Sequence, residues 1–507
     1  MTPAPAINLS VVLPIALVAI GSMAILVGEV LLSRADNLLG RKVTESLIGS
    51  ALAATAIFFL VLALYSAGLA FASGGAQVFD PNRAMIQLDA FSSLVTALLA
   101  VAALLSCALS IAYLSELRIN HGEYYALALL SVSGMMLMVA AVDLIAVFLG
   151  LELMSIPIYV LAGFDRRKLR SNESAIKYFV IGSFASAILL YGMALLYGAT
   201  GSTEFAALRA GLDVADPMAR VGLGLVVVGF AFKISLVPFH QWTPDVYEGA
   251  PSAVTAFMSV TVKVAAFAAL IRLLAMVFDP TDEVLIRVFW LLSALTIIVG
   301  NAMAVIQENV KRMLAYSSIA HAGYLMIGLV TGTIEGYSAL LFYLVSYVFM
   351  NLGAFGVVVS LAHGGSDCER IASFAGLARR RPGLAALMTL FMLSLAGIPG
   401  TAGFLGKFRV FMAAVHSGDL WLLIIGVLMS VVSVYYYLRI PVLMYMREPS
   451  DDAPHKEIAS GEGAVLALCA LAVLALGLLP NRVPLPFFGA VDVLGWARRS
   501  VEMFFGG

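Results

Sequence analysis

The sequence contains few cysteines and no long polar region. Its 507 residues include only three cysteines, Cys107, Cys368 and Cys469, which are too few and too scattered for an iron–sulfur cluster or a zinc site. The longest polar stretches, such as 447–462, leave no room for a nucleotide, flavin or haem domain. We therefore expect neither a cofactor nor a metal site on this chain, and any linked redox chemistry would occur on another polypeptide.

Charged residues are scarce as well, and their scarcity defines the class of protein. Only 12% of the residues are charged whereas 62% are hydrophobic, which is outside the range of ordinary soluble domains. The net charge of −1 gives no reason to expect a nucleic-acid partner. Residues 1–10 contain no Lys or Arg, so a signal peptide would lack its basic region, and we expect the first apolar run to remain as a spanning helix.

Apolar runs long enough to cross a bilayer recur along nearly the whole sequence. They predict an all-α integral membrane protein with about fourteen transmembrane helices. The expected spans are 8–32, 47–73, 88–115, 123–141, 143–164, 173–199, 221–247, 251–278, 285–305, 311–331, 336–363, 383–416, 419–446 and 463–480. The tail 485–505 mixes aromatic and basic residues and is expected at the membrane interface.

The distribution of basic residues predicts the orientation of the chain in the membrane. With the N-terminus outside, the inside loops hold sixteen Lys and Arg residues and the outside segments hold seven. Because cytoplasmic loops are enriched in Lys and Arg, we expect both termini on the outer face of the membrane.

Two of the expected spans are interrupted. Pro238 and Pro244 break the seventh, and the Gly-Ile-Pro-Gly sequence at 397–400 breaks the twelfth. Spans 4–8 and 9–13 are therefore interpreted as two five-helix repeats, inverted because each has an odd number of helices, as in secondary transporters. Two unrelated proline kinks are the alternative. The predicted division is 1–122 (three-helix segment), 123–278 (first repeat), 285–446 (second repeat) and 463–507 (last helix and tail).

Four ionisable side chains lie near the middle of these apolar runs. They are Glu152, Lys233, Lys263 and Lys407. A charge at that depth costs at least about 2.5–3.5 kcal/mol, so such residues usually face the interior of a bundle and mark an ion path. Together they predict a proton relay, in which Glu152 is expected to pair with Lys233. A structural ion pair, or capping of the broken helices, is the alternative.

Three further residues are weaker candidates for the relay. Lys177 enters the sixth span near its start, so its ammonium could also reach the inner surface. His240 and His321 are membrane-embedded, and imidazole is suited to moving protons, although a single histidine between helices often serves only packing.

Several motifs around these residues resemble one known family. They are Leu151–Ser155, Ala175–Phe179, Phe232–Pro251, Lys311–Tyr324 and Gly397–Lys407. They resemble the antiporter-like membrane subunits of bacterial proton-pumping NADH:quinone oxidoreductase, respiratory complex I. The resemblance covers nearly the whole chain, and the combined motifs are highly specific.

This resemblance implies a proton-translocating subunit of a translocase, with no redox active site of its own. NADH, flavin, iron–sulfur clusters and quinone are then expected on partner subunits, and the neighbours are other antiporter-like subunits and the lipid bilayer. The four central residues match the family's glutamate on helix five and its lysines on helices seven, eight and twelve, and Lys177 matches a sixth-helix lysine. An Mrp-type cation/proton antiporter and a silent scaffold of the same complex are the alternatives.

Overall fold

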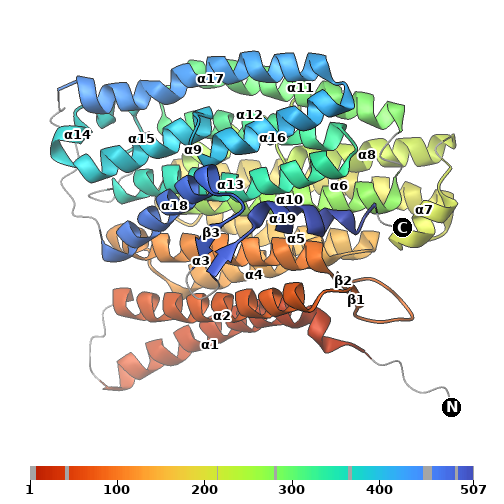
Figure 1. Cartoon of the computed structure of the whole chain (residues 1–507). Coiled ribbons are helices and arrows are strands. Elements are labelled where there is room, and N and C mark those ends of the chain that lie inside the picture. The colour runs from red at the N-terminus through yellow and green to blue at the C-terminus, as the bar shows by residue number, and fades with distance from the viewer. Residues whose placement is uncertain are drawn as a thin grey trace.

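The computed structural model describes residues 7–39, 45–213, 215–278, 282–362, 368–448, 459–485 and 489–505. These parts of the chain form a helical bundle whose long helices run roughly side by side (Figure 1). The prediction of an all-α membrane fold is confirmed.

Twelve helices of the described chain are long and apolar enough to cross a membrane. They are α1 (Leu13–Leu39), α2 (Glu45–Ser73), α3 (Ala90–Glu116), α4 (Gly122–Ala140), α5 (Leu144–Ala162), α6 (Leu169–Thr200), α10 (Ser252–Val277), α11 (Glu283–Val305), α12 (Val310–Val330), α13 (Ile334–Ser360), α17 (Leu420–Met446) and α18 (Ser460–Leu478). Each coincides with one of the expected spans. The full count of fourteen stays a prediction, because the other two spans are broken.

The seventh and twelfth expected spans are each a pair of shorter helices. The seventh consists of α8 (Pro217–Lys233) and α9 (Trp242–Gly249), and the twelfth of α15 (Pro382–Ala396) and α16 (Ala402–Ser417). Gly397 and Gly400 separate α15 from α16 with φ values of 86° and 89°, a conformation that favours glycine. The predicted interruptions are therefore confirmed. The first contains Pro238, whereas Pro244 lies in the first turn of α9, and the second contains the expected glycines.

The remaining elements are short and lie outside the long helices. They are η1 (Leu9–Val12), α7 (Phe205–Gly211), η2 (Ile371–Phe374), α14 (Leu377–Arg380), α19 (Val493–Glu502) and two antiparallel hairpins, β1 (Gln77–Val78) with β2 (Gln87–Leu88) and β3 (Val483–Leu485) with β4 (Gly489–Val491). The tail helix α19 is too short to span a bilayer and packs against α3 and α13.

Burial is highest in the helices at the centre of the bundle. The most apolar windows of α10, α12 and α13 are 94%, 100% and 89% buried, whereas that of α17 is 28% buried. The outer helices α1 and α2 lie together at one edge, and α17 at the opposite edge (Figure 1). The central helices are therefore where a charged side chain finds its partners within the protein, because other helices enclose them.

Close helix packing depends on glycine at particular crossings. A Cβ atom added to Gly134 of α4 would lie 2.4 Å from the backbone nitrogen of Met154, and one added to Gly150 of α5 would lie 2.6 Å from that of Met138. Small residues let the backbones of two helices approach in a membrane. The contact between α4 and α5 fixes the position of the glutamate that α5 carries.

The packing of the two halves is similar, as two repeats require. In the first half α4 packs on α5, and α6 packs on both α8 and α9. In the second half α11 packs on α12, and α13 packs on both α15 and α16. We keep the division into 1–122, 123–278, 285–446 and 463–507 as a proposal that these corresponding contacts support.

Candidate functional site

Lys233 is the last residue of α8, and its side chain lies among hydroxyl groups. Its Nζ donates hydrogen bonds to Ser155 Oγ at 2.7 Å and to Tyr159 OH at 3.2 Å, both on α5. The ammonium also lies over the rings of Tyr159 and Tyr178, 5.2 and 5.8 Å from their centroids. A cation at the C-terminal end of a helix is further stabilised by the helix dipole.

Glu152 lies one helical turn before Ser155 on the same helix and is half-buried. Its Oε1 is buried without a hydrogen-bond partner. Among the described residues no ion pair joins it to Lys233, so the expected pairing is wrong for this conformation. The physical reason is the rotation of α5, which presents the Ser155 and Tyr159 hydroxyls to the ammonium and leaves the carboxylate one turn away.

The break between α8 and α9 is held by side chains rather than left open. Thr243 Oγ1 donates to Ser235 Oγ at 2.7 Å, and the backbone N–H of Val237 donates to Thr296 Oγ1 of α11 at 3.0 Å. Irregular backbone at membrane depth needs such partners, because lipid offers none. The break thus keeps a fixed shape beside Lys233.

Lys263 lies in the middle of α10 and contacts α12 and α13. Its Nζ donates to the backbone carbonyl of Ser318 and lies 5.7 Å from the ring centroid of Tyr347. The Tyr347 hydroxyl donates to Ser318 Oγ at 2.8 Å, and one turn along α13 Asn351 Nδ2 donates to Ser259 Oγ, also at 2.8 Å. Polar groups from three helices therefore surround this ammonium.

His321 of α12 lies three residues after Ser318 and uses both ring nitrogens. Nδ1 lies 2.7 Å from Tyr343 OH on α13, and Nε2 lies 3.1 Å from Tyr437 OH on α17. Tyr437 OH is hydrogen-bonded in turn to Ser317 Oγ. The imidazole thus connects the phenol groups of two neighbouring helices.

Lys407 lies in the second turn of α16 beside the break in the twelfth span. Its Nζ donates to the carbonyl oxygens of Leu395 and Ala396, at the end of α15, and to Ser430 Oγ of α17, each at 3.1 Å. It also lies 4.8 Å from the ring centroid of Tyr324. The carbonyl groups freed where α15 ends are therefore used by the lysine.

Five ionisable side chains thus lie on helices of the bundle; four have polar partners, whereas the buried Oε1 of Glu152 has none. We call the buried polar axis the set Glu152, Lys233, Lys263, His321 and Lys407. The three lysines are no more than 4% exposed. The Ser318 group beside Lys263 and the Ser317 group beside His321 lie on adjacent residues of α12. Among the described residues, no direct hydrogen bond joins these two groups to each other or the Lys233 group to the Lys263 group.

Lys177 lies outside this axis. Its side chain is 40% exposed, and Nζ pairs with Glu173 at 2.7 Å and with Asp245 at 2.9 Å. Asp245 also pairs with Arg312 at 2.7 Å, and Arg312 with Glu248 at 3.0 Å. All of these charged residues except Arg312 line a hollow of about 170 Å³. Sequence reasoning did not single out Asp245 and Glu248. Their spacing of three residues places both carboxylates on one face of a helix, and this pattern could have identified them.

His240 lies in the break between α8 and α9 and is half-buried. Its Nδ1 is buried with no hydrogen-bond partner, and no hydrogen bond within the described chain connects its ring to Lys233. The structure therefore places His240 near the interrupted span but does not join it to the axis.

A second buried cation, which the sequence analysis did not single out, is held differently. Arg272 of α10 pairs with Asp89 at 2.8 Å, and both side chains are 1% exposed. Asp89 also caps α3, and the guanidinium lies 5.7 Å from the ring centroid of Phe504 near the C-terminus. The ion pair and the ring contact together join three distant parts of the chain. The sequence feature that could have identified this site is an arginine within an expected span.

Comparison with known proteins identifies relatives along nearly the whole chain. Residues 141–433 match the family model described as "NADH:quinone oxidoreductase/Mrp antiporter, TM". NADH-quinone oxidoreductase subunit N of Trichlorobacter lovleyi is 43% identical over 481 residues, which cover 94% of this chain and 96% of the relative. Subunit N of Myxococcus xanthus is 39% identical over 532 residues, with 97% of each chain covered.

Solved structures share the fold. A chain of respiratory complex I from Thermus thermophilus with bound Aureothin is 36% identical, with a TM-score of 0.77, covering 92% of this chain and 97% of that one. A chain of the Mrp complex from Dietzia sp. is 22% identical, with a TM-score of 0.82 and 98% of each chain covered. At that identity the second likeness concerns the fold alone.

Proposed function

The chain belongs to the subunit N family of NADH:quinone oxidoreductases, and we propose that its buried polar axis carries the protons that this membrane-arm subunit translocates. Quinone reduction in other subunits of the complex supplies the energy. The chain is thus part of a translocase.

The observation that carries the proposal is the type of partner around the buried lysines. Arg272 has a carboxylate partner, as a permanent buried charge requires. In the described part of the chain, the ammonium groups of Lys233, Lys263 and Lys407 instead contact hydroxyl and carbonyl oxygens, with no carboxylate within 4.0 Å. These neutral partners do not bind the charge permanently, so a proton can arrive and leave.

The geometry suggests how the charge moves in the first half. Lys233 now bonds to Ser155, one turn from Glu152 on α5. A change of the Lys233 rotamer would move its Nζ by one turn of α5, to the unpartnered carboxylate oxygen of Glu152. The ion pair would then hold the proton on Lys233. Return to the hydroxyl position would release it toward Lys263 through water. The expected ion pair thus becomes a second state of the cycle.

In the second half, the hydroxyl groups of α12 provide the path. Each hydroxyl or imidazole can accept one proton and pass on another. The Ser318, Ser317 and His321 groups can therefore carry a proton from Lys263 to Lys407, and no larger ion has to move along the path. Lys407 then acts as the terminal relay toward one face. Lys177 and His240 are proposed to serve only where protons enter from the surface.

We also propose the setting of the chain. NADH, flavin, iron–sulfur clusters and quinone belong to partner subunits, and neighbouring antiporter-like subunits flank this one in the membrane arm. Both termini lie on the periplasmic side of the bacterial inner membrane. The Mrp-type alternative is less supported, because the relatives that are 39–43% identical over nearly the full length are subunits N.

The test is proton pumping by the purified complex in proteoliposomes with Lys263→Met. Methionine keeps an unbranched side chain, one atom shorter than that of lysine, and removes the titratable group. We expect NADH-driven proton uptake and quinone reduction to fall at least tenfold, whereas electron transfer from NADH to ferricyanide, which does not need the membrane arm, stays normal. Wild-type pumping would identify a silent scaffold, and pumping that requires sodium or potassium would identify a cation antiporter.

A further inference from the structure

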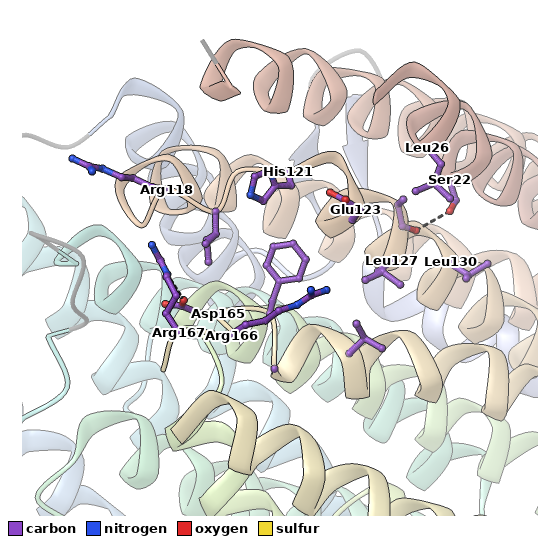
Figure 2. Close-up of a pocket in the computed structure, with 15 residues that line it drawn as sticks. Ser22, Leu26, Arg118, His121, Glu123, Leu127, Leu130, Asp165, Arg166 and Arg167 are labelled. Carbon is purple, nitrogen blue, oxygen red and sulfur yellow. Dashed lines mark hydrogen bonds and ion pairs between the residues drawn. The ribbon is translucent and has the colours of Figure 1, made fainter. Parts of the chain in front are cut away.

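An open groove of about 660 Å³ lies between α1, α4 and α5, outside the buried polar axis (Figure 2). Its apolar walls are formed by Leu26 of α1, Leu127 and Leu130 of α4, and Val160 of α5. Each of these residues lies within a candidate membrane span. The apolar part of the groove is therefore at the depth of lipid acyl chains.

One end of the groove is basic. Arg118 of the α3–α4 loop and Arg166 and Arg167 of the α5–α6 loop line it. The guanidinium of Arg167 already has partners within the chain, since it pairs with Asp165 at 2.9 Å and donates to the carbonyl oxygen of Leu117 at 2.7 Å. The guanidinium groups of Arg118 and Arg166 are exposed and have no hydrogen bond or ion pair within the described ranges.

The positions of these two groups suit an anion at the membrane surface. Figure 2 shows the Arg166 side chain reaching along the groove toward Leu127, while Arg118 lies beyond His121 at the far end. Helix α4 begins beside them, and its N-cap residue His121 makes no side-chain capping bond. The first backbone N–H of this helix, that of Gly122, already donates to Glu29 Oε1 at 3.1 Å, so the two arginines are the groups left to attract an anion.

We propose that the groove binds one anionic glycerophospholipid of the phosphatidylglycerol class. Its phosphate lies against Arg166, Arg118 adds positive charge farther along the same end of the groove, and one acyl chain follows Leu127, Leu130 and Val160. Glu123, which also lines the groove, accepts a hydrogen bond from a headgroup hydroxyl. A phospholipid is favoured over a protein helix because the groove has a charged end at headgroup level and an apolar part at acyl-chain depth.

The experiment is site-specific crosslinking in the intact complex. The purified complex is placed in nanodiscs with phosphatidylglycerol that carries a diazirine on one acyl chain, and crosslinked peptides are mapped by mass spectrometry. We expect labelling of α4 and α5 around Leu127 and Val160. Each arginine removed should lower this labelling about fivefold, the usual contribution of one basic side chain near an anionic headgroup.

The variants are chosen so that folding does not decide the result. Arg118 has a φ of 56°, a conformation that glycine adopts freely, so Arg118→Gly removes the charge and relieves backbone strain. Arg166→Gln removes the second charge, and Arg379→Gln, an exposed arginine of α14, is the matched control.

Three results would overturn the proposal. Equal labelling in the wild type and in the double variant would mean that the arginines do not select the lipid. Equal labelling by diazirine phosphatidylcholine would mean that the groove contacts bulk lipid without preference. Labelling elsewhere on the chain but not in the groove would mean that a neighbouring subunit covers it.

Discussion

At the scale of single residues, the partner of a buried cation distinguishes Arg272 from the lysines of the buried polar axis. Arg272 is paired with Asp89 at 2.8 Å. The lysines of the axis contact hydroxyl and carbonyl oxygens instead. The partner and not the residue type makes this distinction, because the buried Lys311 also pairs with a carboxylate, that of Glu369 at 3.2 Å.

Lys233→Ala should nearly abolish proton pumping and quinone-linked turnover while the complex still assembles. The reason is the loss of the only titratable group at the end of α8. Lys233→Arg should be almost as poor, because an arginine will not release its proton in this range. Pumping and turnover are measured in proteoliposomes, and normal pumping by the assembled Ala variant would make Lys233 a structural residue.

Lys407 offers a comparison between two substitutions. Lys407→Glu keeps a titratable group, so we expect part of the pumping to remain. Lys407→Met should lose most of it, since methionine leaves no titratable group beside the carbonyl groups of Leu395 and Ala396. Both variants are compared by initial rates of proton uptake. Full activity of the Met variant would show that no proton passes through this position.

At the scale of elements, each of the two broken spans has a helix end beside one lysine of the axis. Lys233 is the last residue of α8, and Lys407 donates to the carbonyl groups at the end of α15. The segment between α8 and α9 is fixed through the N–H of Val237, which donates to Thr296 of α11. An isosteric Thr296→Val replacement leaves this buried N–H without an acceptor, at a cost of about 1–3 kcal/mol. The segment should therefore open more often.

Hydrogen–deuterium exchange of peptides that cover 234–241 measures this effect. We expect exchange to become at least fivefold faster in Thr296→Val, and proton pumping to weaken with it. Thr389→Val is the matched control, because the Thr389 hydroxyl bonds only to a carbonyl of its own helix. Unchanged exchange in Thr296→Val would mean that other contacts hold the break.

At the scale of the whole molecule, the orientation in the membrane can be tested with cysteine labelling. Ala76, near the β1–β2 hairpin, and Gly383, at the start of α15, are small and exposed. In a Cys368→Ser background, Ala76→Cys should react with an impermeant maleimide in spheroplasts with an intact membrane. Gly383→Cys should react only after permeabilisation. The opposite pattern would place both termini in the cytoplasm.

Much of the fold could be predicted because its signals are local in the sequence. The length of each apolar run and the prolines and glycines of the broken spans need no knowledge of neighbouring helices. The partners of the charged groups could not be predicted in the same way. The expected Glu152–Lys233 pair was wrong for this conformation, and Lys177 belongs to a surface charge network rather than to the axis.

The sequence by itself determined the membrane class, the positions of the helices, the two interruptions and which titratable groups lie deep in the membrane. Only the tertiary structure decided what each of these groups touches. Lys233 and Ser155 are 78 positions apart, and His321 and Tyr437 are 116 apart. The physical reason is that these helices are apolar on all sides, so no amphipathic pattern indicates which face turns inward. The packing of neighbouring helices sets that rotation, and with it the route open to a proton.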